Sequence, residues 1–230
     1  MKTSGGAYPE SSSPSAHEPI TPGHICLAPY RTVTREQFLL DETRATARLL
    51  VDEAVPEREL VGRIASENLF QYPTTRMVKN VASVIVRRLS EGSLGSARAS
   101  ILELLARAPH IEAAQANLYV MMRSYRVVWE FMTGLVADRY RSQDLHLPRR
   151  DIVHFLDGLA AHEPDVAAWS PSTLAKTVQV LNASLAKAGI KDSIRSDALN
   201  HLYISPELAS CMRLNGDAAT LWAFDCGGGE

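Results

Sequence analysis

The most regular pattern of hydrophobic and polar positions lies in residues 67–89. Pro73 has no N–H group and holds Tyr72 in extended conformations, so it separates two helices, and Thr74 can cap the second one. At about 100° per residue, that second helix has one apolar face and one basic and amide face. The apolar face comprises Met77, Val78, Val81, Ala82, Val84, Ile85 and Leu89, and the polar face comprises Arg76, Lys79, Asn80, Ser83 and Arg87. The pattern predicts a helix-turn-helix unit, although an amphipathic core helix with one solvated face would look the same.

Two further helices are predicted before this one. Thr34 and Gln37 fit a capping box at the start of a helix that runs to about Ala54. Pro56 then occupies the position that favours the start of the next helix. These helices complete a three-helix unit, in which the helix-turn-helix spans residues 57–90.

The middle of the chain predicts the core of a helical bundle. A helix is expected at 96–108, followed by a long core helix at 110–140. Residues 118–132 are apolar on nearly all sides, and a helix of that kind is normally surrounded by its neighbours. Trp129 and Phe131 are expected to fill much of this core.

A second helix-turn-helix-like unit is predicted at 150–204. The Ser170–Pro171 pair is typical of a helix start, and Gly189 is placed where a left-handed cap would end that helix. The following residues contain a strand-like segment at 199–204, and the polar residues 192–197 would form the tip or approach of a wing. We therefore expect this unit to be a winged helix with a short β-ribbon.

The predicted fold class is mostly α, a globular helical bundle with two helix-turn-helix-like units. The Ser- and Pro-rich start of the chain has too few apolar residues to form a core, and the polar segment around Pro148 predicts a boundary. The expected organisation is a disordered leader at 1–29, an N-terminal helical domain at 30–145, a C-terminal winged-helix-like domain at 146–215 and a flexible tail at 216–230.

Composition limits the class of protein. Hydrophobic residues make up 46% of the chain and charged residues 22%, as in ordinary soluble proteins, and the net charge of −2 still permits local basic faces. The three cysteines, Cys26, Cys211 and Cys226, are too scattered for a disulfide framework or a zinc motif. The sequence also lacks a membrane-spanning run and a signal peptide. We expect a cytoplasmic protein.

No catalytic or cofactor-binding motif is found in the sequence. His154 and His162 are eight residues apart on one predicted helix, too far to share a metal ion. The chain has no Walker loop, no dinucleotide-binding glycine motif and no Gly-x-Ser-x-Gly nucleophile elbow. We therefore expect no enzyme activity, no cofactor and no bound metal.

Two stretches resemble a known family. One is Glu67-Asn-Leu followed by a Thr- and Arg-rich helix that ends in Val-Arg-Arg-Leu. The other is Trp169-Ser-x-Ser-Thr-x-x-Lys, which continues to Leu-x-x-Ala-Gly-Ile and then to Ile204-x-Pro206. Together they resemble the BrxA family of bacteriophage exclusion (BREX) phage-defence systems over about residues 30–215. The long leader departs from the family pattern.

The resemblance implies an all-helical, non-enzymatic protein that binds double-stranded DNA and works with a methyltransferase, an ATPase and other BREX proteins. We expect a monomer without membrane association, whose phosphate contacts dominate its DNA binding. The candidate DNA-binding residues are Arg76, Lys79, Asn80, Arg87 and Arg88 in the first unit, and Ser172, Thr173, Lys176, Lys187, Lys191 and Arg195 in the second.

Two alternatives remain open at this point. The helix-turn-helix folds could be scaffolds of a protein-protein adaptor that assembles the defence complex without touching DNA, and the near-neutral net charge favours this interpretation. A weaker alternative is RNA binding by the helical bundle.

Overall fold

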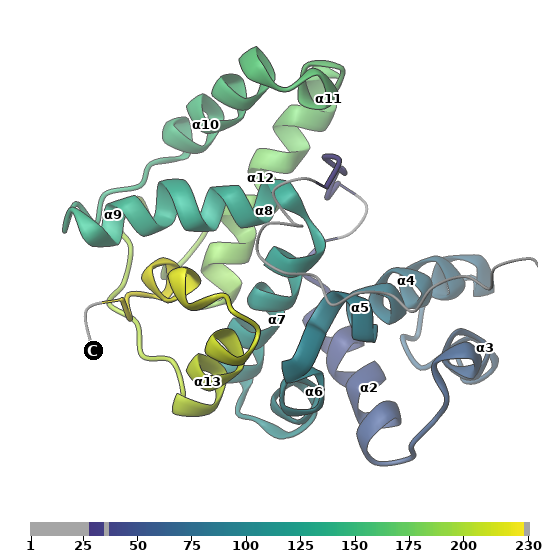
Figure 1. The fold of residues 1–230 in the computed structure, drawn as a ribbon. Coiled ribbons are helices and arrows are strands. Elements are labelled where there is room, and N and C mark those ends of the chain that lie inside the picture. The colour runs from purple at the N-terminus through teal and green to yellow at the C-terminus, as the bar shows by residue number, and fades with distance from the viewer. Residues whose placement is uncertain (1–27, 35–36, 228–230) are drawn as a thin grey trace, which may run out of the picture.

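The computed structural model describes residues 28–34 and 37–227 of the chain (Figure 1). The predicted leader lies outside the described residues, apart from its last two positions. Helices dominate the described part: α2 to α6 lie to one side of the central α7, α10 and α11 lie beyond the α8–α9 rod, and α12 crosses behind that rod. The predicted mostly α fold is confirmed.

The first three helices form the expected unit. They are α2 (Leu40–Val51), α3 (Glu57–Glu67) and α4 (Thr75–Arg88). Each contacts the other two, and a small hydrophobic cluster of Leu49, Leu60, Ile64, Val78 and Ala82 fills the space between them. Residues 57–88 therefore form two helices joined by a turn and packed on α2, and their assignment as a helix-turn-helix stays a prediction.

The start of α2 differs from the prediction. The helix begins at Leu40 rather than at Thr34, and Leu39 just before it has a left-handed backbone (φ 47°). The backbone carbonyl of Gln37 accepts hydrogen bonds from a distant arginine, Arg88, instead of taking part in a helix. Tertiary contacts thus override the local capping pattern.

The turn before α4 is held by side chains. Asn68 ends α3 in a left-handed conformation, and its side-chain oxygen accepts a hydrogen bond from the Tyr72 backbone N–H at 3.1 Å. The Tyr72 hydroxyl donates to Glu42 of α2 at 2.5 Å, and burial together with this carboxylate raises the pKa of Tyr72 to about 12. Thr74 caps α4, because its hydroxyl oxygen accepts from the Met77 N–H at 3.3 Å. The predicted cap is confirmed.

The centre of the molecule is α7 (His110–Ser124), whose residues from Ala113 to Arg123 are all buried. It is preceded by the short α5 (Glu91–Leu94), the 3-10 turn η1 (Gly95–Ala97) and α6 (Arg98–Arg107). The predicted all-round burial of this helix is confirmed.

The long helix predicted at 110–140 is interrupted. Tyr125 is extended (φ −137°, ψ 115°), and the chain restarts as α8 (Arg126–Glu130), a π-helical segment η2 (Phe131–Val136) and α9 (Ala137–Arg141). The Tyr125 hydroxyl accepts a hydrogen bond from the buried Arg88. This long-range contact has no counterpart in the local hydrophobic pattern that predicted one continuous helix.

The second unit consists of α10 (Arg149–His162), the one-turn α11 (Pro164–Ala167) and α12 (Pro171–Lys187). Helix α13 (Pro206–Leu214) follows, and then a 3-10 helix η3 (Ala218–Phe224). α10 packs on α11 and α12, and α12 also contacts the central α7.

The expected β-ribbon is not present among the described residues. Residues 199–204 form no strand, and a single antiparallel bridge joins His146 to Ala198. The Asn200 side-chain amide donates to the Gly189 carbonyl and to the Asp192 carboxylate, and the Asn200 backbone N–H donates to the Ile190 carbonyl at 2.8 Å, so this segment is held against the end of α12. The winged form of the second unit therefore lacks its ribbon in this structure.

One large hydrophobic core extends through most of the described chain. It includes Leu118 of α7, Leu156 of α10, Leu181 of α12 and Met212 of α13. The core thus crosses the predicted boundary at 145/146, and the division into two domains stays a prediction.

A 3-10 helix lies in the segment that was expected to be a flexible tail. This helix, η3, packs against η2, α9 and α13, and Leu221 and Phe224 are buried. These apolar side chains complete the core beside α9. Within the described residues, no helix combines the length and the apolar character needed to cross a membrane.

Candidate nucleic-acid interface

Helix α4 presents a basic surface to solvent. Its apolar positions Val78, Ala82 and Ile85 are buried against α2 and α3, which turns the opposite face outward. Four predicted DNA-binding residues are exposed on this helix: Arg76, Lys79, Asn80 and Arg87. Met77, expected on the buried face, is 46% exposed because it lies in the first turn, beyond the edge of the small cluster.

Arg88 is not part of this surface, which corrects its predicted role. Its side chain is fully buried, its Nε donates to the Tyr125 hydroxyl at 3.1 Å, and both terminal nitrogens donate to the Gln37 carbonyl at 3.1 Å. The guanidinium also lies 5.0 Å from the centre of the Tyr125 ring. A side chain enclosed and bonded in this way cannot reach a DNA phosphate.

The N-terminal end of α12 carries a group of hydroxyls. Ser170 caps the helix, because its Oγ accepts from the Thr173 N–H at 3.2 Å, and the same Oγ lies 2.9 Å from the hydroxyls of Ser172 and Thr173. Ser172 is exposed and Thr173 is half-buried. The first turn of this 17-residue helix also has the positive end of the helix dipole, which favours anions, although Pro171 has no N–H and the Thr173 N–H is already bonded to Ser170.

The basic residues of the second unit are divided between the surface and the core. Lys176 is half-buried and donates to Gln179 at 3.1 Å, while Lys187 and Arg195 are exposed. Lys191 is buried, which corrects its predicted role. Its Nζ donates to the Leu147 carbonyl at 2.6 Å and to the Asn182 side chain at 3.1 Å, and burial lowers its pKa.

Two of the predicted lysines meet at a small hollow beside residues 37–38. The hollow, about 50 Å³ in volume, is lined by Lys176, Gln179 and Lys187 of α12 and by Gln37 and Phe38. The Lys187 ammonium is 5.7 Å from the centre of the Phe38 ring. Gln37 and Phe38 are not among the predicted site residues, because the sequence pattern assigns Gln37 to a capping box and Phe38 is apolar.

Residues 37–38 also connect the hollow to α4. The Gln37 carbonyl holds Arg88, the last residue of that helix. The C-terminal end of α4 and the lysines of α12 therefore lie on either side of the same short segment. The structure does not bring Arg76 into the hollow, because it is 11 residues before Arg87, roughly 16 Å along the helix at 1.5 Å per residue.

The chemistry of these surfaces is that of anion binding. Across the described residues, no group of three or more His, Cys, Asp and Glu side chains could hold a metal ion. The exposed groups are ammonium, guanidinium, amide and hydroxyl donors, which suit phosphate oxygens.

The chain is similar to known proteins over most of its length. A family model described as BrxA matches residues 29–216. The chain is 28% identical over 178 residues to the BREX protein BrxA of Escherichia coli O9:H4 (strain HS), an alignment that covers 76% of this chain and 79% of that protein. It is 25% identical over 194 residues to the BREX protein BrxA of Bacillus cereus (strain H3081.97), covering 82% and 92%.

The fold is also similar to the crystal structure of an uncharacterized protein from Magnetospirillum magneticum. The TM-score is 0.69 at 21% identity, and the match covers 86% of this chain and 98% of that chain. Because the family model spans most of the sequence, including both helix-turn-helix-like units, the chain belongs to the BrxA family.

Proposed function

We propose that this protein is a non-enzymatic, DNA-binding component of a BREX-type phage-defence system. Its curated relatives carry the name BREX protein BrxA, which supports the assignment to the system. DNA binding is supported by the chemistry of two helices, α4 and α12, whose solvent-facing donors suit phosphates.

The observation that carries the DNA proposal is the meeting of the two units at residues 37–38. Arg87 at the end of α4 is exposed, and Lys176 and Lys187 of α12 line the hollow on the other side of this segment. One duplex could then contact cations from both units. Because the contacts would be mainly to phosphates, binding should weaken steeply with salt and depend little on base sequence.

Charge reversal of exposed residues tests the proposal. Binding of a duplex labelled with a fluorophore would be measured by anisotropy over a salt series, for the wild type and for Lys79→Glu and Lys176→Glu. Each variant should weaken binding by about tenfold at low salt. Arg213→Glu is the matched control, because Arg213 is exposed on α13, outside both units, and its reversal should change affinity by less than about threefold.

The outcome separates DNA binding from the adaptor alternative. Absence of duplex binding by the wild type at low salt, or equal losses in all three variants, would contradict the DNA proposal and favour an adaptor. A preference for single-stranded RNA over duplex DNA in competition would favour the RNA alternative instead.

A further inference from the structure

A groove separates α6 from α13 on a part of the surface that shares no residue with the candidate DNA interface. It has a volume of about 870 Å³. Each helix contributes one face: α6 provides Ser100, Glu103, Leu104 and Arg107, with Ala108 directly after its end, and α13 provides Pro206, Glu207, Ser210, Cys211 and Leu214. These spacings of three, four and seven or eight residues follow one side of a helix over about two turns, roughly 12 Å.

The floor of the groove is apolar. Leu104 and Cys211 are nearly buried there, at 8% and 3% exposed. Leu214 at one end is 61% exposed, which is unusual for a large apolar side chain in a chain whose other leucines are mostly in the core. A partner that covered Leu214 would remove apolar surface from water, at about 25 cal/mol per Å².

The rim of the groove is acidic. Glu103, Glu112 and Glu207 are placed around it, and Arg107 is the cation in its lining. Arg107 is already paired, with its Nε 2.6 Å from Glu103 and a terminal nitrogen 2.8 Å from Asp52. Its charge is therefore balanced by those two carboxylates, and Glu112 and Glu207 leave the groove with a net negative charge.

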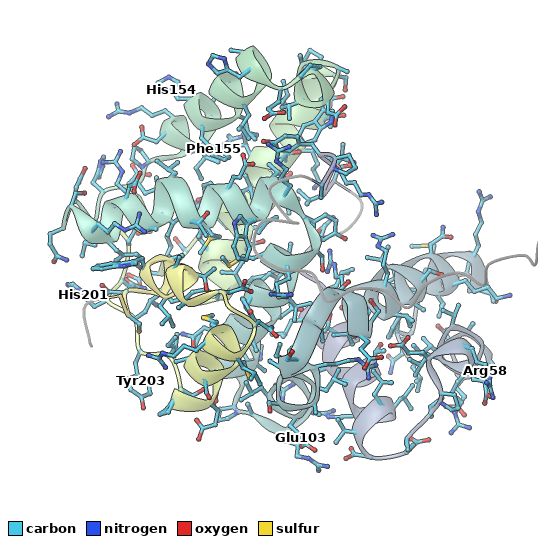
Figure 2. The ribbon with its side chains drawn as sticks, viewed as in Figure 1. Arg58, Glu103, His154, Phe155, His201 and Tyr203 are labelled. Atoms are coloured by element: carbon cyan, nitrogen blue, oxygen red, sulfur yellow. The ribbon has the colours of Figure 1, made fainter. Side chains whose placement is uncertain are left out.

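This surface cannot serve the same ligand as α4 and α12. A groove rimmed by carboxylates repels the phosphates of a nucleic acid and attracts cations. An amphipathic helix suits a groove of this chemistry, because its apolar side would lie on Leu104, Cys211 and Leu214. Lysines or arginines on either side of that apolar stripe would then face the glutamates. In Figure 2, Glu103 lies on α6 at the lower edge of the molecule.

We propose that the groove between α6 and α13 binds a cationic amphipathic helix of a partner protein. This site is separate from the proposed DNA interface, so one molecule could hold DNA and a protein partner together. Glu112 and Glu207 select the positive charge of the partner helix, and Leu214 contacts its apolar side.

A synthetic helix provides the first test. A fluorescent peptide of about 18 residues, roughly 27 Å long, with a leucine stripe flanked by lysines would be compared with a peptide in which glutamates replace the lysines. The full-length protein should bind the lysine peptide, and Glu112→Lys/Glu207→Lys should weaken that binding by at least about tenfold. Asp157→Lys/Asp165→Lys, an equal change of charge at exposed sites on α10 and α11, should leave it within about threefold. Equal binding of both peptides, or equal losses in both double variants, would overturn the proposal.

Photo-crosslinking in cells provides the second test. A photoreactive amino acid at the exposed Ser210, between Glu207 and Leu214, should crosslink to a protein of the same defence system through a lysine- or arginine-rich helix. Glu112→Lys/Glu207→Lys should abolish that crosslink and leave duplex DNA affinity unchanged, so failure here is distinct from failure of the DNA proposal. Crosslinks to DNA, to a second copy of the chain or to its own residues 1–27, or no crosslink at all, would contradict the proposal.

Discussion

Arg88 shows how a single basic residue can connect three parts of a fold. Its guanidinium joins the end of α4 to the Gln37 carbonyl and to the Tyr125 hydroxyl, where α7 gives way to α8. A buried guanidinium stabilises the fold by donating hydrogen bonds to buried acceptors. Its removal leaves the Gln37 carbonyl and the Tyr125 hydroxyl without this donor. The role of Arg88 is therefore in stability and in placing the two helices.

Replacing Arg88 should destabilise the protein. Arg88→Ala removes several hydrogen bonds and opens a cavity, so the free energy of unfolding should fall by about 2 to 4 kcal/mol. Urea denaturation followed by circular dichroism measures this change. Lys79→Ala, a truncation at an exposed position of the same helix, should stay within about 0.5 kcal/mol of the wild type. Equal stability of both variants would show that the buried bonds of Arg88 contribute nothing measurable.

The difference between Arg88 and its neighbours could be predicted only in part. Helical periodicity places Arg88 next to the apolar face of α4, whereas Arg76 and Lys79 lie well outside that face. The pattern therefore predicts exposure for Arg76 and Lys79 but does not decide it for Arg88. Lys191 gave no such signal, because it follows the end of α12, where helical periodicity no longer applies. One hydrogen-bond partner of Lys191, Leu147, is distant in the sequence, and the other, Asn182, lies in α12 on the other side of a turn. The burial of Lys191 therefore depends on tertiary contacts.

At the scale of elements, local signals predicted helix ends well. Thr74 and Ser170 both act as N-caps, and α12 begins at Pro171 as the sequence indicates. The failures lie where a distant group decides the conformation. Tyr125 breaks the long core helix within a nearly continuous apolar segment, and the Asn200 side chain, instead of a paired strand, holds residues 199–204.

The cap of α4 can be tested directly. Thr74→Ala removes the acceptor for the Met77 N–H in the first turn, so the free energy of unfolding should fall by about 1 kcal/mol. Thermal or urea denaturation measures the change. Thr75→Ala is the matched control, because Thr75 is exposed at the first helical position and is not the cap. If the two substitutions cost the same, the hydroxyl of Thr74 is not a significant cap.

At the scale of the whole molecule, the fold separates two kinds of surface. Cations and hydroxyls lie on α4 and α12, on either side of residues 37–38, whereas carboxylates surround the groove of α6 and α13. A chain with a net charge of −2 can therefore still have a local basic face. Whole-chain composition does not reveal this separation, because it depends on which helix faces the packing of the core turns outward.

The salt dependence of DNA binding tests whether both units contact one duplex. Five exposed or half-exposed cations, Arg76, Lys79, Arg87, Lys176 and Lys187, would displace about five counterions, so the slope of log K against log salt should be about −4 to −5. Lys79→Ala and Lys176→Ala should each make the slope shallower by about 0.9.

The double variant decides the arrangement. If one duplex contacts both units in a complex of one protein with one DNA molecule, the two changes should add, and the slope should become shallower by about 1.8. If the units bind separate duplexes, Lys79→Ala should affect only the binding step of the first unit, and Lys176→Ala only that of the second. The tighter of the two steps should then respond to only one of these substitutions. Isothermal titration over a salt series resolves the two cases, because it reports the stoichiometry together with the affinity. Additive losses at a stoichiometry of one would place α4 and α12 on the same DNA molecule, whereas two steps with separate sensitivities would show that the two units bind separate duplexes.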